Sequence, residues 1–157
     1  MPLARRLRWV PDVADLFERV LMLKQTPTFA GVSTEDLRVI AQELVEEAYF
    51  AGERVFDIDD PSEQFYIVQA GQVGISIDPD LDSNRFLTVL GPGECFGELS
   101  LFDQQPRSAT ARIIEDTQLL ALTHSKLRGL LMAYPELAFG LLRGLSLRLR
   151  NANRRMT

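Results

Sequence analysis

Cysteine and histidine are almost absent from the 157 residues: each occurs once, as Cys95 and His124. A single cysteine excludes an internal disulfide and is typical of a reducing compartment. A zinc site built by the protein needs several histidine or cysteine ligands, so we expect no metal site. Ser-His-Asp catalysis would have to use His124, which stands at an expected helix start. We therefore expect that the chain is not an enzyme.

Two further features are missing: a long apolar run and a basic excess. No apolar run approaches the ~20 residues that span a bilayer. The net charge of −5 argues against extensive nucleic-acid binding. The basic N-terminus lacks the apolar core of a secretory signal. We expect a cytoplasmic protein, or the cytosolic domain of a larger one, without a membrane span and without direct nucleic-acid contact.

The composition that remains is that of a globular chain with one sizeable core. Apolar residues make up 46% and charged residues 25%, close to ordinary usage. We expect a single domain over residues 1–157. Its parts are N-terminal helices (1–47), a strand-rich centre (48–123) and C-terminal helices (124–157).

Apolar residues at helical spacing mark the N-terminal part. Residues 12–24 predict a first helix, with Pro11 suited to its first turn. A second helix is predicted to begin at Ser33, whose hydroxyl can cap it. The residues expected to form its buried stripe are Leu37, Ile40, Ala41, Leu44 and Val45.

The C-terminal part is also predicted to be helical. A short apolar segment ends at Tyr134-Pro135, and a longer helix begins at Glu136. The stripe of this helix is Leu137, Leu141, Leu142, Leu145 and Leu149. Five arginines and no acids follow Glu136. They are compatible with DNA contact or with cations solvated along a helix and near its C-terminus.

The centre reads as short strands separated by turns. The predicted strands are residues 48–50, 54–56, 64–70, 72–78 and 84–90, followed by strand-like runs at 108–115 and 118–123. Gly71 is expected to divide the third from the fourth, and Asp116 the last two. Six to eight short strands at this spacing predict an antiparallel barrel or jelly roll. The fold class is α+β, mainly β.

Residues 91–112, GPGECFGELSLFDQQPRSATAR, bring together groups that can grip an anion carrying hydroxyls. Arg107 can donate two parallel hydrogen bonds to a phosphate, and Ser108 can add a hydroxyl donor. Glu98 can accept a hydrogen bond from a sugar hydroxyl, while Gly97 allows close backbone approach. An ion pair between Glu98 and Arg107 that closes the loop explains the same residues. The residues alone leave both readings open.

This segment resembles the phosphate-binding cassette of cyclic nucleotide-binding domains, the family of the catabolite activator protein and protein kinase A regulatory subunits. Phe-Gly-Glu-Leu-Ser, the nine-residue step to Arg107 and the following Ser-Ala-Thr match its pattern. Upstream, FYIVQAGQVGISI looks like the family's paired strands around a glycine turn. The resemblance covers roughly residues 20–155. It implies an antiparallel, jelly-roll-like β-roll flanked by helices, with cAMP or cGMP as regulatory ligand and no cofactor.

The resemblance also implies roles for individual residues. Glu98 would bind the ribose 2′-hydroxyl, and Arg107, Ser108 and the Ala109 amide the cyclic phosphate. The residues that would complete the loop are Gly97, Leu99 and Ser100. The sugar and base pocket would be lined by Ile75, Leu87, Thr88 and Leu90. The base itself would be contacted by Asn151 and Asn153. Ordinary core packing explains the apolar pocket positions equally well. Solvation at the end of a helix explains Asn151 and Asn153 equally well. Family members that favour cGMP often have threonine directly after the cassette arginine. The serine at this position here, Ser108, favours cAMP.

The function implied is a regulatory module in which ligand binding shifts the C-terminal helix. Its partners would be the cyclic nucleotide, an effector outside this chain and a second copy joined through the C-terminal helix. One alternative is a degenerate domain that serves as a protein-interaction surface. Another is a truncated transcription factor of the catabolite-activator type. A cupin-like enzyme is disfavoured because its metal site needs several histidines.

Overall fold

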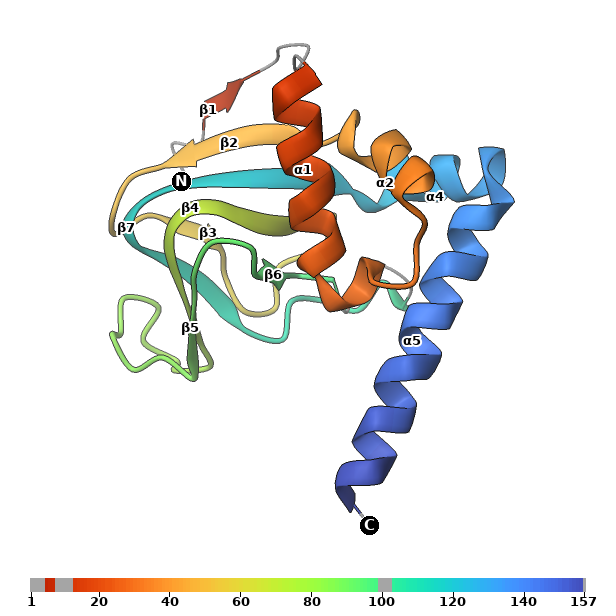
Figure 1. Ribbon diagram of the computed structural model, residues 1–157. Coiled ribbons are helices and arrows are strands. Elements are labelled where there is room, and N and C mark those ends of the chain that lie inside the picture. Colours follow the sequence, from red (N-terminus) through yellow and green to blue (C-terminus); the bar gives the residue numbers. More distant parts are fainter. Residues whose placement is uncertain (1–4, 8–12, 99–102, 157) are drawn as a thin grey trace. The chain divides into compact units, whose positions relative to one another are not determined.

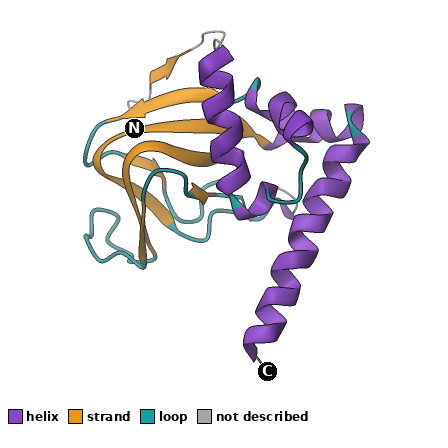
Figure 2. Ribbon diagram, viewed as in Figure 1, coloured by secondary structure: helices purple, strands orange, loops and turns teal. Residues whose placement is uncertain are grey.

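The computed structural model describes residues 5–7, 13–98 and 103–156 (Figure 1). The chain forms two compact units. One comprises Met1–Trp9 and Leu44–His124, and the other comprises Val10–Glu43 and Ser125–Thr157. The first unit holds the strands and the second is helical (Figure 2). This division follows the predicted alternation of helices, strands and helices along the chain, while the single-domain assignment stays a prediction.

The strand unit is an antiparallel sheet rolled around its own core, which confirms the predicted fold class. Its strands are β1 (Arg5–Leu7), β2 (Val45–Tyr49), β3 (Arg54–Phe56), β4 (Gln64–Ser76), β5 (Thr88–Leu90), β6 (Cys95–Phe96) and β7 (Thr110–Thr123). The main path runs β1-β2-β7-β4-β5, while β3 pairs with β7 and β6 with β4. Because β4 and β7 occupy the middle of the path, they position everything else in the roll.

Strands β4 and β7 are each continuous, so the predicted divisions at Gly71 and Asp116 are wrong. The two strands pair from Gln64↔Thr123 to Ser76↔Thr110. Between Ala70↔Gln118 and Gln72↔Glu115, one residue of β4 faces two of β7. Such a bulge bends both strands without ending them. Gly71 adopts φ +102° there, so its glycine signal marks a bend and not a hairpin.

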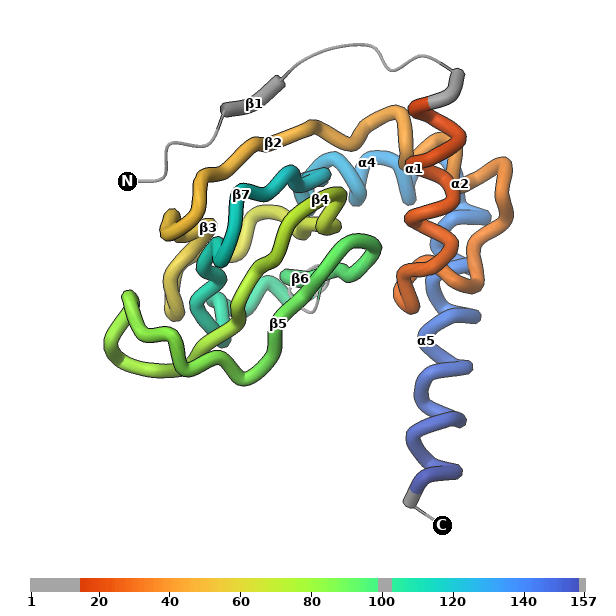
Figure 3. Tube along the Cα trace, turned by 60° about the vertical axis from the view of Figure 1, so that its left-hand side comes forward, coloured from red at the N-terminus to blue at the C-terminus, as the bar shows by residue number. Residues whose placement is uncertain are grey.

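The remaining strands differ from the prediction mainly at their ends. Strand β3 lies at 54–56 as predicted, whereas β5 is limited to Thr88–Leu90 and not 84–90. Side-chain hydrogen bonds within the loop before β5 stabilise its turns. The Asp80 amide donates to the Asp78 carboxylate, and the Asp82 amide donates to the Asp80 carboxylate. This loop projects from the roll in Figures 1 and 3. Short strands β1 and β6 were not predicted, because neither has the length to show alternation.

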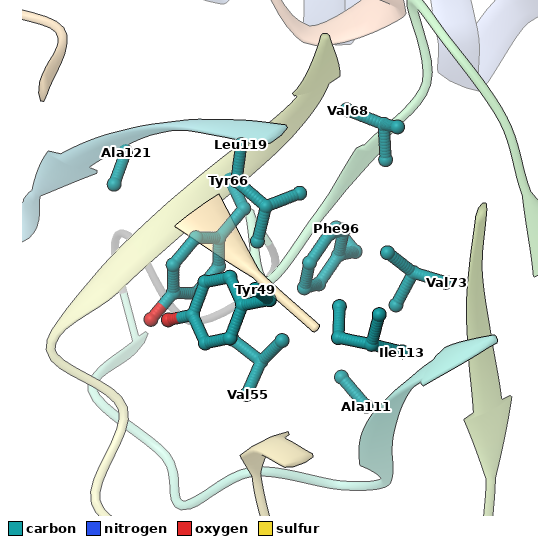
Figure 4. Close-up of a cluster of buried hydrophobic side chains, with 10 residues drawn as sticks. All are labelled: Tyr49, Val55, Tyr66, Val68, Val73, Phe96, Ala111, Ile113, Leu119 and Ala121. Atoms are coloured by element: carbon teal, nitrogen blue, oxygen red, sulfur yellow. The ribbon is translucent and has the colours of Figure 1, made fainter. Parts of the chain in front are cut away.

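The core of the strand unit is an apolar cluster that includes three large rings. Its members are Tyr49, Val55, Tyr66, Val68, Val73, Phe96, Ala111, Ile113, Leu119 and Ala121 (Figure 4). The Tyr66 and Phe96 rings stack with centroids 5.0 Å apart, and Phe56 lies tilted against both at 6.0 and 5.9 Å. These aromatic contacts hold β3, β4 and β6 together at one place.

The helical unit contains α1 (Val13–Gln25), the 3-10 helix η1 (Pro27–Phe29), α2 (Thr34–Ala41), α4 (His124–Ala133) and α5 (Pro135–Met156). Ser33 caps α2 as predicted, accepting a hydrogen bond from the Asp36 amide at 3.2 Å. Helix α2 ends at Ala41, so Leu44 and Val45 are not part of its stripe. Val45 instead begins β2, which suits its β-branched side chain.

Helix α5 has one buried and one exposed apolar side. Leu137 and Leu141 are buried, whereas Leu142, Leu145 and Leu149 are 56%, 49% and 59% exposed. Within the described residues, no single helix is long and apolar enough to cross a membrane. Helices α4 and α5 meet the length and composition test only as a pair, which is bent by 113°.

Candidate functional site

Arg107 is a buried cation with unused hydrogen-bond donors. Its residue is only 5% exposed. Nη2 donates to the Gln64 carbonyl at 2.6 Å, and the guanidinium carbon lies 4.0 Å from the Phe56 ring centroid. Nε and Nη1 are buried without a hydrogen-bond partner. Because a buried unsatisfied donor is unfavourable, this arrangement is suited to receive an anion.

Burial makes the charged form of Arg107 less favourable than it is in water. Burial lowers the pKa of Arg107, and Tyr66, Asp60 and Glu63 raise it by less. An arginine nevertheless stays protonated in proteins, so burial does not neutralise it. A bound anion would compensate the charge that burial has stripped of water.

The alternative ion pair between Glu98 and Arg107 is not formed within the described part of the chain. Nε and Nη1 of Arg107 have no hydrogen-bond partner, and the third guanidinium nitrogen, Nη2, donates to the Gln64 carbonyl. Glu98 is half-buried and lines the same cavity as Arg107. Both charged groups are thus available to a ligand.

Gly97 lets the guanidinium approach the backbone. It adopts φ +82°, a conformation that L side chains rarely adopt. A Cβ at this position would lie 2.6 Å from Arg107 Nη1 and 3.3 Å from the Gln64 carbonyl oxygen. Only glycine fits this position without displacing the arginine.

The backbone around Arg107 is fixed to the loop that follows β3. The Arg107 amide donates to the Asp60 carbonyl, and the Asp59 amide donates to the Arg107 carbonyl, both at 2.8 Å. The Ile58 amide donates to Thr110 Oγ1 at 2.9 Å. These reciprocal bonds place the arginine from two sides before any ligand is present.

A cavity of about 300 Å³ lies against these groups, at the lower end of the range for small-molecule sites. It is lined by Phe56, Ile75, Thr88, Leu90, Cys95, Phe96, Gly97, Glu98, Arg107, Ser108 and Ala109. Eight of these residues were predicted from the sequence. Apolar walls with one cation and one carboxylate can hold a flat molecule that carries an anion and a hydroxyl.

The other predicted residues do not join them. Leu87 is 66% exposed and does not line the cavity, because the chain at 84–87 is loop and not strand. Leu99 and Ser100 lie outside the described residues. Asn151 and Asn153 are exposed on α5 in the helical unit, so their contact with a base stays a prediction.

Three lining residues were missed: Phe56, Cys95 and Phe96. The alternation in Arg-Val-Phe (54–56) predicted a strand but did not show which side faces a ligand. Cys95 and Phe96 belong to β6, which pairs with β4 through Ile67↔Cys95 and Tyr66↔Phe96. Only their position directly before Gly97 could have drawn attention to them.

Arg107 and Phe56 also line a second cavity, of about 500 Å³. Three carboxylates, those of Glu47, Asp60 and Glu63, line it as well. Like charges repel an anion, so the smaller cavity, with Glu98 as its one lining carboxylate, is the better anion site.

Known proteins resemble this chain in both sequence and structure. A family profile described as the cyclic nucleotide-binding domain matches residues 46–134. The cyclic AMP receptor protein of Thermus thermophilus is 35% identical over 131 residues, which are 83% of this chain and 61% of that protein. The chain thus spans about three fifths of this relative's length.

Two solved structures extend the likeness. The N-terminal domain of a transcriptional regulator from Streptomyces coelicolor A3(2) is 36% identical with a TM-score of 0.77, covering 87% of this chain and 97% of that one. The regulatory domain of Toxoplasma gondii PKA, crystallised with cAMP, is 28% identical with a TM-score of 0.70, covering 76% and 46%. The chain belongs to the cyclic nucleotide-binding domain family, as its segment 91–112 predicted.

Proposed function

We propose that this chain binds a cyclic nucleotide in the 300 Å³ cavity and acts as a regulatory module. The cyclic phosphate pairs with Arg107, assisted by Ser108 and the Ala109 amide, and Glu98 accepts the ribose 2′-hydroxyl. The observation that carries this proposal is the pair of buried, unpartnered donors Nε and Nη1 of Arg107. A phosphate satisfies both with the parallel geometry that a guanidinium offers.

We favour cAMP over cGMP as the ligand. Ser108 stands directly after the arginine, where relatives that prefer cGMP often have threonine. The Thermus receptor is named for cyclic AMP, and the Toxoplasma regulatory domain was crystallised with cAMP. Both comparisons support the proposal through the overall likeness of these proteins to this chain.

The output of the module is a shift of α5 when the nucleotide binds. A ligand changes the population of two states only if it binds one of them more tightly. The exposed leucines of α5 provide an apolar surface for a second copy of the chain, and an effector outside this chain would read the change. A non-binding interaction domain and a truncated transcription factor are the alternatives.

Isothermal titration calorimetry with cAMP, cGMP and linear AMP tests the proposal. We expect heat from both cyclic nucleotides, tighter binding of cAMP and much weaker binding of AMP, whose doubly charged phosphate does not match a site for a cyclic monoanion. Absence of heat with either cyclic nucleotide at high micromolar concentration would favour the interaction-only alternative.

A further inference from the structure

Glu47 is a buried carboxylate that the proposed nucleotide site does not use. It lies in β2 and is 2% exposed, at a position where a strand with one side in the core usually carries an apolar side chain. Burying a carboxylate is unfavourable unless hydrogen bonds compensate for the lost water. Both of its oxygens accept such bonds: Oε1 from the Tyr49 hydroxyl at 2.7 Å and Oε2 from the Gln64 side-chain amide at 3.1 Å. The carboxylate therefore links β2 to the beginning of β4.

The side chain of Gln64 is held by a second partner. Its amide nitrogen also donates to the Tyr66 hydroxyl at 2.8 Å. Tyr49 and Tyr66 are both 5% exposed, and their hydroxyl groups point to the same side of the core cluster (Figure 4). Hydrogen bonds to a carboxylate and to a phenol fix the orientation of the Gln64 amide.

The backbone of the same residue holds Arg107. The Gln64 carbonyl accepts from Nη2 of the guanidinium at 2.6 Å. Gln64 is the first residue of β4, and among the described strands it pairs with β7 alone, through Gln64↔Thr123. Strand ends open more readily than strand centres. Because β7 lies between β2 and β4 in the sheet, the bond to Glu47 gives the end of β4 a second support.

We propose that Glu47 is a positioning residue for Arg107 and that it acts through Gln64. The carboxylate fixes the Gln64 amide, and the Gln64 carbonyl fixes the guanidinium, whose Nε and Nη1 remain for a ligand. Glu47 lines the larger cavity and not the proposed nucleotide cavity, so its part in binding is indirect. The effect on nucleotide affinity rests on the proposed function, whereas the effect on Arg107 does not.

The Nε–H resonance of Arg107, measured by NMR on the whole chain without nucleotide, tests the positioning. Arg107→Lys lacks this resonance and so assigns it. Glu47→Leu removes both acceptors, and Gln64→Met removes the side-chain amide but keeps the backbone carbonyl. We expect the resonance to shift in each of these two variants, because the support of the guanidinium is lost. Gln64→Met still decides the question if Glu47→Leu does not fold.

Two further variants separate positioning from charge and from general damage. Glu47→Gln keeps a carbonyl oxygen for the Gln64 amide and can donate to the Tyr49 oxygen, so it should keep the wild-type resonance. Glu46→Leu is the matched control, because successive strand residues face opposite sides and Glu46 lines neither cavity. A shift in Glu47→Gln as large as that in Glu47→Leu would overturn a role through hydrogen bonds.

Calorimetry with cAMP extends the test to nucleotide binding. Glu47→Leu and Gln64→Met should each weaken binding about 3- to 10-fold, the usual effect of one hydrogen bond. Since both changes break the same connection, the double variant should lose no more affinity than either single variant. Losses that multiply in the double variant would contradict action through Gln64.

The resonance and the affinity decide different statements. If the Arg107 resonance stays in place in either Glu47→Leu or Gln64→Met, the connection from Glu47 through Gln64 does not position the arginine and the inference is wrong. If cAMP does not bind to the wild type at all, the proposed function fails, while the resonance still decides the role of Glu47.

Discussion

Arg107 and Gly97 act as one unit at the scale of single residues. The guanidinium is held by the Gln64 carbonyl and the Phe56 ring, and it fills the space that a side chain at position 97 would occupy. The arginine is placed before the ligand arrives, so binding does not have to order a long flexible side chain.

Gly97→Ala should therefore reduce cAMP affinity by at least about tenfold, or 1.4 kcal/mol, because the new methyl group displaces Nη1. The positive φ should cost about 1–2 kcal/mol of folding stability in addition. Calorimetry and urea unfolding measure the two effects. Gly52→Ala is the matched control, since Gly52 also has a positive φ but an added Cβ meets nothing within 4 Å. An affinity loss shared by both variants would contradict the account.

Glu98 is predicted to recognise the ribose, and a double-mutant cycle separates this role from general damage. Replacing cAMP by its 2′-deoxy form should cost the wild type roughly 1–3 kcal/mol, because the Glu98 carboxylate loses its partner. In Glu98→Ala the same replacement should cost almost nothing. If both proteins lose equal affinity for the deoxy form, the hydroxyl is bound by another group.

The limits of sequence reasoning at this scale are visible at Phe56 and Leu87. The resemblance of residues 91–112 to a phosphate-binding cassette predicted that Glu98, Arg107 and Gly97 belong to one site, and all three line one cavity; the spacing of the two charges alone left an ion pair equally open. Nothing local showed that Phe56, far upstream, stacks on the guanidinium. Leu87 was misplaced because the loop before it is shaped by side-chain hydrogen bonds of Asp78 and Asp80, which period-two alternation does not register.

At the scale of elements, the long strands β4 and β7 set the geometry of the roll. Gly71 and Asp116 are turn-forming residues in sequence, so a hairpin and a strand break were reasonable predictions. They fall instead at one shared bulge, opposite each other across the two strands. Whether a glycine bends a strand or ends it depends on its partner strand, which a local pattern does not contain.

Helix α5 offers a test of its two sides. Leu137 is fully buried and Leu142 is 56% exposed. Leu137→Ala should destabilise the protein by about 2–5 kcal/mol, the usual range for a buried leucine. Leu142→Ala should change stability by less than about 0.5 kcal/mol. Urea unfolding followed by circular dichroism compares them, and equal losses would show that α5 buries a different side.

At the scale of the whole molecule, the exposed side of α5 is predicted to join two copies of the chain. Leu142, Leu145 and Leu149 follow one another at helical spacing. Sedimentation equilibrium should give a dimer for the wild type and a monomer for Leu142→Glu combined with Leu145→Glu. Leu147→Glu is a matched control, because Leu147 is 54% exposed and lies about half a turn from that stripe. A wild-type monomer at every concentration would contradict the prediction.

The chain spans about three fifths of the length of the Thermus receptor. The effector that this chain would control is therefore a proposal. What unites the observations is a strand roll that carries an unsatisfied buried cation and a helical unit with an unpaired apolar side. The first suits a ligand and the second a partner, which is the pair of surfaces that a regulatory module needs.

The most direct test is the cAMP affinity of Arg107→Ala measured by calorimetry. The account predicts a loss of about 2–5 kcal/mol, the usual effect of truncating one member of a buried charge pair. Arg85→Ala, which removes the same charge from an exposed position of the strand unit, should bind cAMP as the wild type does. If Arg107→Ala keeps the wild-type affinity, the phosphate binds elsewhere and the proposed site is wrong.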